Sequence, residues 1–160
     1  MAWKNTIKNA ILNALVHQYN GNSPASTNVS LPSAGWMCLY TAMPTLGSDG
    51  EFTGGTEVSG GGYHRLNMNT VGLGGAHYFA TPATTDAQGK ASIANSIAIQ
   101  FAQSTAAWGT VVGIGIMENE NPTPEEKPYL IGTLTNPEGV PVMENETLSF
   151  AAGQLKLTLQ

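Results

Sequence analysis

The chain has 160 residues, which is enough for one domain with its own hydrophobic core. Hydrophobic residues make up 41% and charged residues only 11%; the net charge is −5, and the six basic residues are scattered. A protein that binds nucleic acid needs clustered Lys and Arg to neutralise phosphates, and an anionic membrane surface makes a similar demand. Neither is therefore expected as a partner.

Residues 1–20 are predicted to form one amphipathic helix. Trp3, Ile7 and Ile11 recur at helical spacing on one side, while lysines and asparagines occupy the other. The helix ends at Asn20 and Gly21, which both accept a left-handed backbone. We expect it to pack on its own domain; packing on a neighbouring subunit is the alternative. A connector rich in Ser, Pro and Asn follows at 21–34.

From residue 35 the hydrophobic pattern changes to period two, which is typical of strands. A long Gly-rich loop is expected at 43–62. Gly113 and Gly115 leave one face of their strand bare, which would let another layer approach closely. Residues 35–160 are therefore predicted to form a mainly β, antiparallel sandwich or jelly-roll-like domain. The predicted strands are 35–41, 63–68, 76–80, 90–93, 96–101, 111–116, 129–135, 148–150 and 154–160.

Each candidate catalytic or metal-binding motif lacks a residue that the motif requires. Ser59 lacks the glycine two residues earlier that a nucleophile elbow requires, because Glu57 stands there. His17, His64 and His77 lie far apart, without a partner at ligand spacing. The Gly-rich runs lack the third glycine of a dinucleotide-binding loop. We expect no enzyme activity, no metal and no cofactor.

Cys38 lies in an alternating apolar run and is predicted to be a buried strand residue. A structural turn is predicted a little further on, where three glycines permit a bend that other residues could not make. The tyrosine that follows would anchor the turn in the core, and the arginine would pair with Glu57. The turn residues are Gly60, Gly61, Gly62, Tyr63 and Arg65.

The densest charge lies in a segment that also carries several prolines. We expect it to be a solvated hairpin tip. The alternative is a contact loop, because prolines would keep it stiff and lower the entropy cost of docking. Together with the helix residues Trp3, Ile7 and Ile11, this segment supplies the candidate interface: Glu118, Glu120, Pro122, Pro124 and Glu125.

A series of short motifs runs through nearly the whole chain: MAW at 1–3, LYTAMP at 39–44, EVSGGGYHR at 57–65, IQF at 99–101, AAWGTV at 106–111, GIGI at 113–116, LIGTL at 130–134 and LSFAAGQL at 148–155. In this order they resemble small structural proteins of the tailed-bacteriophage virion, a family often labelled tail-fibre or minor structural proteins. The chain departs from that pattern in a longer connector at 20–34 and in the Pro/Glu loop at 118–128.

The resemblance implies a non-enzymatic, β-rich component of the virion, assembled in the bacterial host cytoplasm. Its partners would be the major capsid protein or tail proteins. Because no fibrous shaft repeat is present, we expect a capsid decoration or cement protein that stabilises the shell. A tail-fibre, baseplate or adaptor component and a host-carbohydrate-binding module are the alternatives. The bare strand faces and low charge favour a homotrimer.

Overall fold

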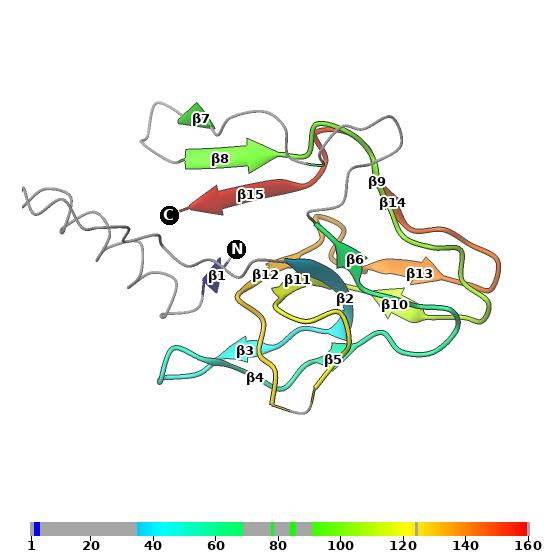
Figure 1. Ribbon diagram of the computed structural model, residues 1–160, viewed down its shortest axis with the longest axis horizontal. Coiled ribbons are helices and arrows are strands. Elements are labelled where there is room, and N and C mark those ends of the chain that lie inside the picture. Colours follow the sequence, from blue (N-terminus) through cyan, green and yellow to red (C-terminus); the bar gives the residue numbers. More distant parts are fainter. Residues whose placement is uncertain are drawn as a thin grey trace, which may run out of the picture.

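The computed structural model describes residues 2–3, 35–68, 78, 84–85, 91–123 and 125–159. The described residues form antiparallel strands joined by turns and loops, as Figure 1 shows. The strands are β1 (Ala2–Trp3), β2 (Trp36–Ala42), β3 (Thr45–Leu46), β4 (Phe52–Thr53), β5 (Thr56–Glu57), β6 (Leu66–Asn67), β7 (Thr84–Thr85), β8 (Ala91–Ala94), β9 (Ile99–Gln100), β10 (Gly109–Val111), β11 (Gly113–Met117), β12 (Leu130–Thr133), β13 (Val140–Val142), β14 (Ser149–Phe150) and β15 (Lys156–Leu159).

The largest sheet has the order β1-β12-β11-β2-β5, and β6 also pairs with β2. Its central strands are apolar on both faces. Met37, Leu39 and Ile114 belong to the main core cluster, whereas Cys38 and Met117 belong to a smaller cluster on alternate positions of the same strands. Strands covered on both sides become nearly continuous apolar runs, which explains the sequences of β2 and β11.

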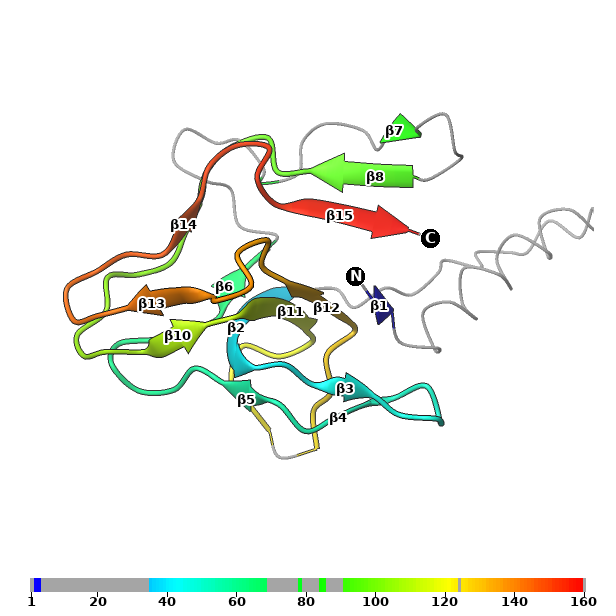
Figure 2. The ribbon, with the colours of Figure 1, turned by 180° about the vertical axis from the view of Figure 1, so that it is seen from behind.

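Four smaller sheets surround this one (Figure 2). They are the pairs β10–β13, β9–β14 and β3–β4, and the three-stranded sheet β15-β8-β7. The main core cluster joins the largest sheet to residues of β9, β10, β13 and β14, including Ile99, Val111, Val142 and Phe150. This packing holds the turns that form the candidate site.

The glycines of β11 do not admit a separate layer, contrary to our expectation. A Cβ added to Gly115 would lie 2.7 Å from Cε2 of Tyr40 and 2.9 Å from Sγ of Cys38, and one added to Gly113 would collide with Met43. Large side chains from β2 and the segment after it therefore fill the space that the glycines leave. The two glycines serve packing within one sheet.

The prediction of a mainly β, antiparallel fold is confirmed. The sandwich or jelly-roll arrangement stays a prediction, and so does the three-part division of the chain. The strand predicted at 76–80 is described only at residue 78, which lies in a turn. The expected loop at 43–62 contains the β3–β4 hairpin and β5 instead. A turn in which Gly47 N–H donates to Glu51 O at 2.8 Å makes that hairpin possible.

The predicted helix falls outside the described residues except at its beginning. There the prediction is wrong, because Trp3 lies in β1, where it pairs with Leu130, and Ala2 pairs with Ile131. At these two residues the backbone pairs with the edge of the main sheet. Within the part of the chain that the structure describes, no helix has the length and apolar character needed to cross a membrane.

Candidate functional site

The glycine turn takes the shape that only glycine adopts readily. Gly60, Gly61 and Gly62 have φ values of 71°, 54° and 73°. The carbonyl of Gly61 accepts hydrogen bonds from Trp108 Nε1–H at 2.9 Å and from Thr105 N–H at 2.8 Å. The turn is thus fastened to the segment between β9 and β10.

Tyr63 fixes the end of this turn. Its ring stacks on Phe101 with centroids 6.4 Å apart and meets Trp108 edge-on at 5.6 Å. Its hydroxyl donates to Glu57 Oε1 and accepts from Leu39 N–H, both at 3.0 Å. Burial, the largest cause, raises the pKa of the Tyr63 hydroxyl, so it remains a neutral hydrogen-bond donor.

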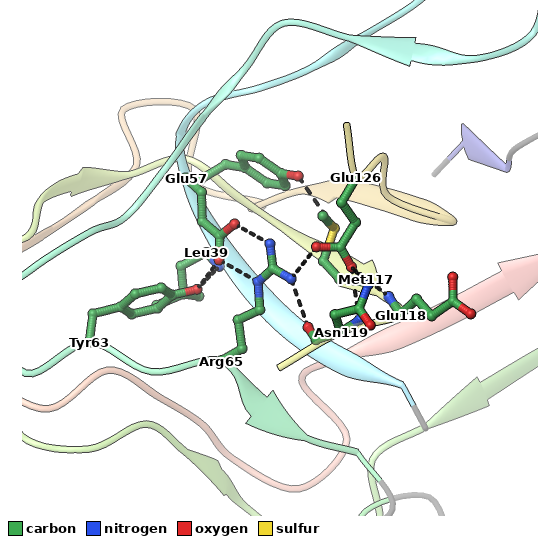
Figure 3. Close-up of polar contacts among 9 residues, drawn as sticks. Leu39, Glu57, Tyr63, Arg65, Met117, Glu118, Asn119 and Glu126 are labelled. Atoms are coloured by element: carbon green, nitrogen blue, oxygen red, sulfur yellow. Dashed lines mark hydrogen bonds and ion pairs between the residues drawn. The ribbon is translucent and has the colours of Figure 1, made fainter. Parts of the chain in front are cut away.

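Arg65 lies at the centre of a buried charge cluster (Figure 3). Its Nε and Nη2 form a bidentate pair with the Glu57 carboxylate at 2.8 and 2.6 Å. Its Nη1 donates to Glu126 Oε2 and to the carbonyl of Asn119, both at 2.7 Å. Side-chain exposure is 2% for the arginine, 15% for Glu57 and 6% for Glu126. The expected pairing of Arg65 with Glu57 is present, and a second carboxylate completes it.

Glu126 also closes its own loop. Its Oε1 accepts hydrogen bonds from the N–H groups of Glu118 at 3.1 Å and Asn119 at 2.8 Å, while its Oε2 meets Arg65. Burial alone would lower the pKa of Arg65, but hydrogen bonds to Glu57 and Glu126 outweigh it and raise that pKa. The guanidinium therefore stays charged and joins the loop to the glycine turn.

The acidic segment is in consequence only partly a solvated tip. Glu118, Glu120, Pro122 and Glu125 are exposed, whereas Glu126 turns inward. Pro124 lies outside the described residues, as do Ile7 and Ile11, and of Trp3 only the backbone pairing is described. The structure therefore places four of the candidate interface residues on one surface loop. Whether they contact a partner stays a prediction.

Cys38 is fully buried beside Tyr40 and Met117, as predicted. Burial, the largest cause, raises the pKa of its thiol from 9.0 to about 12, so almost no thiolate exists at neutral pH. The Tyr40 hydroxyl donates to Sδ of Met117 at 3.7 Å. This is an apolar packing cluster without an activated nucleophile.

The described residues contain no group of three or more His, Cys, Asp or Glu side chains that could hold a metal ion. His64 and Ser59 are exposed, and His17 and His77 lie outside the described part. Trp108 is 5% exposed and therefore offers no open aromatic surface for a sugar, whereas Trp36 is half-buried against the smaller cluster.

Two buried polar residues were missed by the sequence analysis. Asn95 donates to the carbonyls of Ile97 and Ala151 at 2.8 and 2.9 Å, and its Oδ1 accepts from Leu155 N–H at 2.8 Å. Ser104 donates to carbonyls of the turn after β13. Both fasten turns to the core, and neither carries a sequence signal beyond the ordinary preference of Asn and Ser for turns.

The described residues form a β-rich fold in which buried polar side chains tie the loops together. The chain matches the family described as podophage GP4 fiber I protein gp80 over residues 2–158, and it belongs to that family. No curated protein and no solved structure matches it. The resemblance to phage structural proteins is confirmed. The chain is thus a structural component of a phage particle, associated with other particle proteins.

Proposed function

We propose that this protein is a non-catalytic component of the tail-fibre apparatus, which works by being held in place by other proteins of the particle. The family description, fibre I protein, is the observation that carries this proposal. It changes the order of the alternatives, since the sequence alone favoured capsid decoration. The lack of a fibrous shaft repeat keeps decoration as the second candidate.

The acidic loop is the contact element in this proposal. Its exposed residues Glu118, Glu120 and Glu125 form a charged rim. Glu126 accepts hydrogen bonds from Arg65 and from the N–H of Glu118, and so holds the two ends of the loop together. A loop already held in one conformation loses less entropy on docking than a mobile one. A rim of this charge fits a partner surface that carries Lys or Arg.

The predicted homotrimer belongs to the same proposal. Charged residues make up 11% of the chain, against about 25% in an average soluble protein, and the cores of interfaces between subunits are likewise depleted in charged residues. Native mass spectrometry of the purified protein would measure this directly. A species of three chains supports the trimer, and a monomer that persists at high concentration contradicts it.

The location is tested by immunogold electron microscopy on intact particles, with antibodies raised against the purified chain. Gold at the tail is the expected result, and gold distributed over the shell would favour decoration instead. Particles without this protein, complemented with the wild-type gene, provide the control. Complete absence of label from intact and from disrupted particles would contradict both candidates.

A further inference from the structure

A cleft lies where two sheets end beside each other. It has a volume of about 370 Å³ and is lined by the end of β12 and the beginning of β15. In the main sheet, β12 lies next to the short edge strand β1. In both ribbon views β15 runs past the β12 side of the main sheet (Figures 1 and 2). The cleft therefore has a sheet edge on each side.

On the first edge, the backbone groups of Thr133 have no partner among the described residues. Leu134 N–H donates to Val112 O at 2.9 Å, so Leu134 is a hydrogen-bonded position of the β11–β12 ladder. Such positions alternate in an antiparallel pair. The N–H and C=O of Thr133 consequently point away from β11, and β1 covers this edge only at Leu130 and Ile131.

On the second edge, the backbone groups of Lys156 also face outward. Asn95 N–H donates to Leu155 O at 3.0 Å, which makes Leu155 a hydrogen-bonded position toward β8. The N–H and C=O of Lys156 therefore point away from β8. Within the described part of the chain, no strand pairs with Thr133 or Lys156 on these outward sides.

The floor between the edges is apolar. Leu148, Phe150 and Leu155 are 6%, 9% and 7% exposed, and Leu134 packs against the same core cluster. Lys156 is the one charged residue among the described residues that line the cleft. Two open backbone edges above an apolar floor are what an extended peptide strand with apolar side chains at alternate positions requires.

We propose that an extended strand of a neighbouring virion protein inserts into this cleft, pairs with Thr133 and Lys156, and so joins the two sheets. The edge of β12 already accepts an antiparallel strand, because β1 pairs with it at Ile131, two residues before Thr133. The donor is assigned to a different protein because the chain belongs to a phage fibre family, and this membership implies association with other proteins of the particle. The inference rests on the proposed function and adds to the acidic loop a second contact that holds the protein in the particle.

The test uses Thr133→Pro in the phage genome. Proline removes the outward N–H of Thr133 while the bonds to β11, made by Gly132 and Leu134, remain, and edge strands tolerate proline. Thr133→Val keeps the N–H and is the matched control. We expect Thr133→Pro to leave the melting temperature within a few degrees of wild type and to lower the copies per particle about tenfold or more. Thr133→Val should be incorporated as wild type is.

Incorporation of a folded Thr133→Pro protein at the wild-type level would overturn the proposal. If the proline variant does not fold, a benzophenone amino acid at position 133 replaces it, and intact particles are irradiated. A crosslink to another virion protein supports the inserted strand; no crosslink between chains, or one only to a second copy, overturns it. Wild-type protein absent from particles would instead contradict the proposed function itself.

Discussion

Replacing Arg65 by methionine tests the buried charge cluster, because methionine keeps an unbranched side chain and removes the charge. Arg65 as a whole is 5% exposed, and its guanidinium lies between the carboxylates of Glu57 and Glu126, whose side chains are 15% and 6% exposed. Removing one partner from a buried ion pair leaves uncompensated charge and costs about 3–5 kcal/mol. At about 2–4 °C per kcal/mol for a chain of this size, the melting temperature should fall by roughly 6–20 °C.

Urea denaturation followed by tryptophan fluorescence measures this loss of stability. A triple variant with Glu57→Gln, Arg65→Met and Glu126→Gln removes all three charges and should recover most of it, since replacing a whole buried cluster costs far less than breaking it. Lys156→Met removes an exposed cation and should change stability by less than about 0.5 kcal/mol. A loss below about 1 kcal/mol for Arg65→Met, or no recovery in the triple variant, would refute the reasoning.

The remaining predictions concern the turn, the buried thiol and the N-terminal segment. Gly61→Ala should lower the free energy of unfolding by more than about 2 kcal/mol, because the backbone there is left-handed and the new Cβ would also lie 2.8 Å from a carbonyl oxygen. Gly54→Ala, at φ 67° with open space around it, should lower it by about 1–2 kcal/mol. Equal losses in denaturation would contradict this. The pKa of Cys38 is raised from 9.0 to about 12, so the folded state retains a proton that the unfolded chain releases, and stability should fall as pH rises from about 9. Cys38→Ala should flatten that fall; an identical slope for both proteins would refute the assignment. Ile7→Asp, in the predicted apolar stripe, should reduce incorporation into particles, and normal incorporation measured by immunoblotting would contradict it.

Strands were predictable where side chains alternate between a buried and an open environment, or where the run is apolar throughout. Strands β2, β11 and β12 satisfy this condition, and their positions were predicted within about two residues, the usual uncertainty of strand ends. Strand β13 was not predicted, because Pro141 lies at its centre and its pairing with β10 is what makes it a strand. The β3–β4 hairpin was not predicted either, because it lies in a Gly-rich run and only the pairing of its two strands defines it.

The candidate site divides in a similar way. The ion pair between Arg65 and Glu57 was predictable because the residues are eight positions apart on either side of a glycine turn. The contact with Glu126 spans sixty-one positions, and nothing in the acidic segment marks this glutamate among its neighbours. Contacts of that separation are set by the pairing of strands in three dimensions, which hydrophobic periodicity does not specify.

Counting the copies of this chain in purified phage particles against the major shell protein, by quantitative mass spectrometry, tests the central claim most directly. The proposal of a tail-fibre component predicts a small count in multiples of three or six. A count on the scale of the shell protein would contradict it and establish a decoration protein, and absence from the particle would contradict a structural role altogether.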